Sequence, residues 1–128
     1  MPEQLAGDAI LWRRIEPNKL HKEGGLHRPQ SAAFLPDSDG EICVHIAALT
    51  TLEGVSEAYP NAGIVAFPAS LPALLGYTVF ARPSLDDASH AVILPHGDWG
   101  SKKLRRLANA IIEGLGQDPW IRRNFQDE

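Results

Sequence analysis

Apolar residues alternate with polar ones over several short segments of this chain, the two-residue period of β-strands. The pattern predicts strands or extended structure over residues 9–15, 31–34, 41–49, 63–67, 77–83 and 90–95. A turn is predicted at residues 36–40 from their Pro, Asp and Gly content. Residues 17–31 are polar, hold two glycines and two prolines, and are predicted to form a long loop with one helical turn after Pro17.

The clearest helical pattern lies in residues 101–116. Apolar residues fall there on one face of a 3.6-residue period, at Leu104, Leu107, Ala108, Ile111 and Leu115. Because strands and helices do not follow a strict β-α-β order, we expect a single α+β domain over residues 1–128. It has about five to six strands, two to three helices and a C-terminal amphipathic helix. Residues 117–128 form a tail that either docks on the domain or contacts a partner.

Two shorter helices are predicted from their end signals. Thr50 and Glu53 form a capping box, and the helix that follows must stop at Pro60. A second short helix is predicted between a Ser70 cap and Gly76, which suits the position after a helix end.

Composition narrows the class of protein. The chain has 128 residues, 44% of them hydrophobic and 22% charged, which is typical of one globular domain. Its net charge of -4 argues against general nucleic-acid binding. Cys43 is the one cysteine, which excludes a disulfide framework and fits a reducing compartment. The chain shows no signal peptide and no apolar run long enough to span a membrane, so we expect a cytoplasmic protein.

The stretch GGLHRPQSAAF, residues 24–34, brings His27, Arg28 and Ser31 together in front of an apolar segment. Two glycines allow a backbone to approach a ligand closely, and a guanidinium suits phosphate or carboxylate. We therefore take His27, Arg28 and Ser31 as candidate ligand-binding residues. The alternative is an arginine ion pair, a solvated histidine and a serine that caps a turn.

Arg13 and His90 are further candidates for ligand binding. One of the neighbours Arg13 and Arg14 must share the inward face of its strand and needs a carboxylate partner or a ligand anion, although an internal ion pair is the commoner explanation. His90 opens a predicted strand and offers acid–base chemistry near neutral pH. The histidine and cysteine spacings match no zinc pattern, and no common catalytic or nucleotide motif is present. We therefore predict neither a metal nor a cofactor.

The predicted helix 101–116 begins with the cations Lys102, Lys103, Arg105 and Arg106. Cations oppose the macrodipole at a helix N-terminus. They either belong to a solvated face paired with acids, or bind an anion together with the N–H groups of the helix. Lys102 and Arg105 complete the set of predicted ligand-binding residues.

The segments LWRRI, GGLHRPQSAAF, GIVAFPASLPALLGYTV and DDASHAVIL…KKLRRLA resemble a family of small bacterial proteins. The family pattern has Arg-Arg in a first strand, then Arg-Pro-Ser-Ser-Ala-Ala-Phe, and Pro-Ala-His-Ala before a basic helix. The resemblance covers roughly residues 11 to 110. It departs at Gln30, where the family has Ser, and at Ala88-Ser89, where it has Pro-Ala. It implies a bacterial protein and no particular activity.

Together these features favour a bacterial accessory protein that binds a protein partner or a small anionic ligand without catalysing a reaction. The alternative is a small enzyme that acts on a nucleotide or phosphoester. In that case His27 or His90 is the general acid or base and Arg28 holds the anion. The sequence does not determine the oligomeric state.

Overall fold

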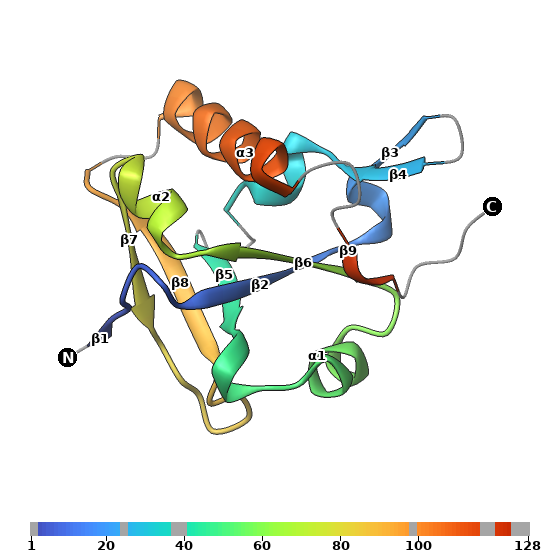
Figure 1. The fold of residues 1–128 in the computed structure, drawn as a ribbon, viewed down its shortest axis with the longest axis horizontal. Coiled ribbons are helices and arrows are strands. Elements are labelled where there is room, and N and C mark those ends of the chain that lie inside the picture. The colour runs from blue at the N-terminus through green and yellow to red at the C-terminus, as the bar shows by residue number, and fades with distance from the viewer. Residues whose placement is uncertain (1–2, 24–25, 37–40, 98–99, 116–119, 124–128) are drawn as a thin grey trace.

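A seven-stranded antiparallel sheet forms the centre of the computed structural model, which describes residues 3–23, 26–36, 41–97, 100–115 and 120–123 (Figure 1). The strand order is β1-β7-β8-β5-β2-β6-β9, and a separate hairpin pairs β3 with β4. The strands are β1 (Glu3–Gln4), β2 (Ile10–Ile15), β3 (Leu20–Glu23), β4 (Leu26–Pro29), β5 (Ile42–Ile46), β6 (Gly63–Pro68), β7 (Tyr77–Ala81), β8 (His90–Pro95) and β9 (Trp120–Arg123). The helices are α1 (Leu52–Ala58), α2 (Ser70–Leu74) and α3 (Ser101–Leu115), with 3-10 turns η1 (Pro17–Lys19), η2 (Ser31–Phe34) and η3 (Ala47–Leu49).

The sheet separates two layers of helices. Helices α3 and α2 and the turn η2 lie over one face, and α1 lies beyond the other (Figure 1). The main hydrophobic core fills the space between the sheet and α3, with Leu11, Val44 and Val65 packed in one cluster with Leu107 and Ile111. The predicted α+β class, with a C-terminal amphipathic helix, is confirmed.

Two central strands show how burial follows position in the sheet. Strand β2 alternates, with Leu11, Arg13 and Ile15 buried and the residues between them half-buried. All five residues of β5 are buried, because this strand lies in the middle of the sheet and both of its faces are covered. The predicted strand over 41–49 is shorter in the structure, since η3 follows directly after Ile46.

The short helices have the predicted positions but different N-caps. The side chain of Thr51, and not that of Thr50, accepts the capping hydrogen bond from the backbone N–H of Gly54 at 3.0 Å. Ser70 is the first residue of α2 and follows the N-cap Ala69. The predicted end at Gly76 is confirmed, because its φ of 89° lies in the left-handed region that glycine adopts without strain.

The segment between β2 and β5 differs most from the prediction. The expected long loop contains a hairpin, with His21 opposite Arg28 and Lys22 opposite His27. The expected helical turn after Pro17 is present as η1. Residues 31–34 form a 3-10 turn and not extended structure. A Gly-Gly pair between two short runs is a hairpin signal, but these runs lack the apolar alternation that marks a strand.

The chain returns to the sheet after α3. Residues Trp120–Arg123 form β9 and pair antiparallel with β6 at one edge of the sheet. Trp120 is half-buried and packs against the hydrophobic core. The role of residues 117–128 in partner contact stays a prediction, since most of this segment lies outside the described residues. No helix in the described part of the chain has the length and apolar character needed to cross a membrane.

Candidate functional site

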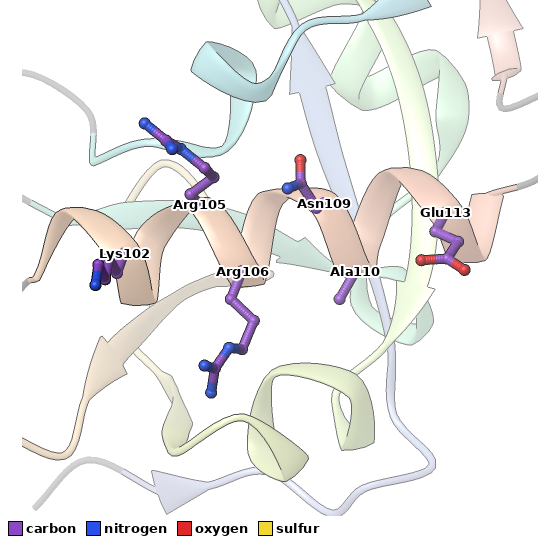
Figure 2. Close-up of a pocket in the computed structure, with 6 residues that line it drawn as sticks. All are labelled: Lys102, Arg105, Arg106, Asn109, Ala110 and Glu113. Carbon is purple, nitrogen blue, oxygen red and sulfur yellow. The ribbon is translucent and has the colours of Figure 1, made fainter.

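The outer side of α3 carries the predicted basic residues. Leu107, Ala108 and Ile111 are fully buried on the inner side of the helix. The helical period therefore turns Lys102, Arg105 and Arg106 outward, and all three are exposed. These three residues are called the cationic face below. A shallow depression of about 460 Å³ along this side is lined by Lys102, Arg105, Arg106, Asn109, Ala110 and Glu113 (Figure 2).

The cationic face has no acidic partner within the described residues. Ion pairs join Arg82 to Glu41 and Arg122 to Glu53. Lys102, Arg105 and Arg106 form no ion pair within the described residues. The alternative interpretation, a solvated helix face paired with acids such as Asp98, involves a residue that lies outside the described part of the chain.

Lys103 is a different case from its neighbours. Its Nζ lies 5.0 Å from the centroid of the Tyr77 ring, and the side chain is half-buried. A cation over an aromatic face stabilises the packing of a helix onto the sheet. Lys103 therefore holds α3 against β7 and does not belong to the cationic face.

The cations spread outward along the helix. In Figure 2, Arg105 and Arg106 point to opposite sides of α3, and Lys102 lies nearer its N-terminus. The two guanidinium groups do not converge on one point, as the clamping of a single phosphate requires. This arrangement presents separated charges to an extended surface.

Arg13 is the buried arginine that the strand pattern predicted. Its Nη1 donates to the carbonyl of Cys43 at 2.7 Å, and Nε and Nη2 donate to that of Ala33 at 3.0 and 2.9 Å. Strands β2 and β5 pair only at Leu11–Ile46 and Trp12–His45, so the guanidinium bridges the strands where their backbone pairing has ended. This geometry gives Arg13 a structural role, and its role in ligand binding stays a prediction.

His90 lies on the opposite face of the sheet from Arg13. It is paired with His45, which is paired with Trp12, the residue before Arg13. The Nδ1 atom of His90 donates to the backbone carbonyl of Arg82 at 2.8 Å, which fixes the tautomer of a neutral ring. Arg13 and His90 therefore do not share a pocket.

The other predicted residues lie on the hairpin side of the molecule. The backbones of His27 and Arg28 belong to β4 and that of Ser31 to η2, while their side chains lie outside the described residues. The sequence predicts that the Gly-Gly loop lies close to the strand that begins at His90, because both bring a histidine to the edge of the sheet. The two glycines lie outside the described residues, but in Figure 1 the flanking strands β3 and β4 lie at the upper right, away from the lower end of β8 where that strand begins, so this prediction is wrong. Strand β4 and the start of β8 therefore lie in separate regions of the molecule.

A buried polar network around His45 was not predicted from the sequence. Its Nδ1 lies 3.0 Å from Oδ2 of Asp87 and 3.3 Å from Oγ of Ser89. Ser89 donates to Oδ1 of Asp87 from Oγ at 2.5 Å and from its backbone N at 2.9 Å. The sequence showed only a Cys-x-His pair and a DDASH run, which lie too far apart along the chain to suggest this contact. These bonds hold the β7–β8 connection against β5.

This network resembles a catalytic Ser-His-Asp triad in composition but not in geometry. A triad needs the serine on one ring nitrogen and the carboxylate on the other. Here Ser89 and Asp87 both lie on the Nδ1 side of His45. The Nε2 atom is buried without a hydrogen-bond partner among the described residues. Ser89 is therefore not placed as the nucleophile of such a triad.

The stability of the protein should fall as the pH is lowered from 7.5 to 5. Burial lowers the pKa of His45, and the neighbouring Asp87 opposes this shift only in part. The unfolded chain, with a histidine pKa of about 6.5, therefore binds the proton more readily than the folded chain. The free energy of unfolding should decrease as the pH falls below the histidine pKa of the unfolded chain. It should continue to decrease until the pH falls below the pKa of His45 in the folded chain. Urea titrations across this range measure the slope.

Two variants separate this effect from other titrations. His45→Gln should flatten the slope, whereas His96→Gln, which removes an exposed imidazole, should leave it in place. Protonation of Asp87 affects the stability at a lower pH than protonation of His45 does. Burial tends to raise its pKa, but the hydrogen bonds from Ser89 and the nearby His45 more than compensate and lower it. A slope in His45→Gln equal to that of the wild type would contradict the assignment to His45.

No group of three or more potential metal ligands is found within the described parts of the chain. The chain matches no family model, no curated protein and no solved structure.

Proposed function

We propose that this domain binds an acidic protein partner through the cationic face of α3, without catalysing a reaction. One observation carries the proposal. Lys102, Arg105 and Arg106 are exposed around one depression, and none of them has a carboxylate partner among the described residues. An acidic partner would supply the missing opposite charges.

Repulsion among the cations of the cationic face supports this interpretation. Three like charges within two turns of one helix repel one another, and Lys102 also opposes the helix dipole in the first turn. The chain as a whole has a net charge of -4, so this positive region stands out from an acidic background. Such a region steers an oppositely charged partner toward one part of the surface.

The spread of the cations favours a protein surface over a small anion. Arg105 and Arg106 point to opposite sides of the helix (Figure 2), and Glu113 lines the same depression. A single phosphate contacts only part of such a surface, whereas acidic side chains along a partner can meet each cation separately. The catalytic alternative names His27 or His90 as the acid or base. The side chain of His27 lies outside the described residues, and Nδ1 of His90 donates to the backbone carbonyl of Arg82, so this alternative gains less support than binding.

The proposal includes a cytoplasmic location in a bacterial cell. The chain has a single cysteine, Cys43, which is buried in β5. Proteins without disulfides are usual in a reducing compartment. The bacterial origin rests on the resemblance described above.

The binding of poly-L-glutamate should depend on the cationic face. We expect the wild-type protein to bind this polymer at low ionic strength and to bind it less as salt is added. Replacing Lys102, Arg105 and Arg106 together by glutamine should abolish the interaction. Fluorescence anisotropy of a labelled polymer measures both effects, and inorganic pyrophosphate as a competitor distinguishes a small-anion site from an extended one.

A second triple variant provides a control for net charge. Lys19 belongs to η1, Arg82 follows β7 and Arg122 belongs to β9, so none of them is part of α3. Replacing these three by glutamine changes the net charge by the same amount. This control should still bind the polymer. If both variants lose binding equally, or if neither does, the cationic face is not the binding surface. Competition by pyrophosphate at stoichiometric concentrations would favour a small anionic ligand instead.

A further inference from the structure

An exposed leucine lies on the helix that runs beside α3. A Cβ atom on Gly114 would lie 3.4 Å from Cδ1 of Leu71, and one on Gly76 would lie 3.5 Å from Nζ of Lys103. These contacts place α2 along one flank of α3. On α2, Leu74 has a relative exposure of 86%, among the largest of any apolar residue described. The fold therefore buries little of the apolar surface of this side chain.

The same flank of α3 is not uniformly charged. In Figure 2, Arg106 and Ala110 project from α3 on the side where α2 lies, and Arg105 projects on the other side. The depression thus has cations toward its N-terminal half and the small apolar Ala110 on its α2 flank. Leu74 does not line the depression but is exposed on the neighbouring helix. A ligand that carries only charge would leave the apolar part of this surface uncovered.

Charge also changes along the helix. The cations lie in the first half of α3, and Glu113 lies in its last turn, where the helix dipole is negative. A uniformly acidic ligand would be attracted at one end and repelled at the other. The matching partner has its acidic residues confined to about two helical turns.

We infer that the partner presents an amphipathic α-helix which lies along α3. Its acidic residues meet Lys102, Arg105 and Arg106, and an apolar side chain at the border of the acidic face packs on Leu74 and Ala110. The inference rests on the proposed function and adds the form of the partner to it. Amphipathic helices combine an apolar stripe and a charged face at fixed spacing, which is the combination that this surface requires. Nucleic acid fits less well, because Glu113 would face its phosphates.

Two synthetic peptides of equal composition test the form of the partner. Each has about 18 residues, enough for about five helical turns, and contains Ala, Glu, Gln and Leu. In the patterned peptide, the glutamates fill one face over two turns and the leucines border that face. In the second peptide the same residues are scrambled. Isothermal titration calorimetry gives both affinities for the wild type, for Leu74→Ala and for the triple glutamine variant of the cationic face.

The patterned peptide should bind the wild type about tenfold more tightly than the scrambled one, which corresponds to burial of one leucine side chain. Leu74→Ala should remove this preference and leave poly-L-glutamate binding unchanged. Equal affinities for the two peptides, or a preference that survives Leu74→Ala, would overturn the helical partner and leave the proposed function intact. If the triple glutamine variant bound poly-L-glutamate as well as the wild type does, the proposed function itself would be overturned. Sedimentation equilibrium adds a last outcome, since a dimer that disappears in Leu74→Ala would identify a second copy of the chain as the occupant and overturn the inference.

Discussion

Replacing Arg13 by methionine should lower the free energy of unfolding by about 3–5 kcal/mol. Methionine fills part of the volume of the arginine side chain but donates no hydrogen bond. The carbonyls of Ala33 and Cys43 would lose the donors that now lie within 3.0 Å of them. An unsatisfied buried acceptor costs about 1–3 kcal/mol, and bonds from a charged donor are stronger than neutral ones. Urea titration followed by circular dichroism measures the change.

Two further variants identify the cause of that loss. Arg13→Lys keeps the charge, but one ammonium group cannot reproduce the planar set of donors, so its effect should be almost as large. Arg14→Met changes the next residue of β2, whose guanidinium carbon lies 4.1 Å from the Tyr59 ring centroid. Loss of that contact should cost about 0.5–1 kcal/mol. If Arg13→Met and Arg14→Met had equal effects, the bridging role of Arg13 would be wrong.

Replacing Leu107 by alanine should lower the free energy of unfolding by about 2–5 kcal/mol. Leu107 has a relative exposure of 0% and belongs to the cluster that joins α3 to the sheet. The variant loses the transfer free energy of the buried carbons and leaves a cavity, because the surrounding strands can move only partly into the space. The same urea titration tests this prediction.

Leu74→Ala makes the same chemical change at an exposed position of α2. It should alter the free energy of unfolding by no more than about 0.5 kcal/mol, because a surface substitution removes few contacts. This variant therefore also serves as a folded protein in the binding experiment. A loss below about 0.5 kcal/mol in Leu107→Ala would show that the inner face of α3 is not packed as described.

The inner and outer sides of α3 were predictable from sequence alone. Buried and exposed residues repeat with the helical period, so Leu107 and Ile111 had to share a side and Arg105 and Arg106 had to lie off it. Local signals likewise placed the central strands and the end of α2 at Gly76. The helical period of α3 does not predict which side chains surround the cations. Whether an acid from another segment pairs with them depends on tertiary structure.

Arg13 shows the limit of strand periodicity. The pattern correctly required one of the two neighbouring arginines to point inward, and it suggested a carboxylate or an anion as the partner. In the structure the guanidinium donates to backbone carbonyls, because β5 separates from β2 after two residue pairs and η2 passes beside the gap. No local sequence pattern predicts the residue at which two strands far apart in the chain stop pairing.

The α+β class, the central strands and the amphipathic character of α3 follow from local sequence, since each depends on the local period of apolar residues. The polar contacts depend on how distant segments fold together. His45 meets Ser89 across 44 positions of the chain, Arg13 meets Cys43 across 30, and α2, which carries Leu74, packs along α3. Hydrophobic burial is nearly non-directional and leaves a repeating pattern in the sequence, whereas a hydrogen bond needs two particular groups within about 3 Å of each other. The fold alone brings such groups together.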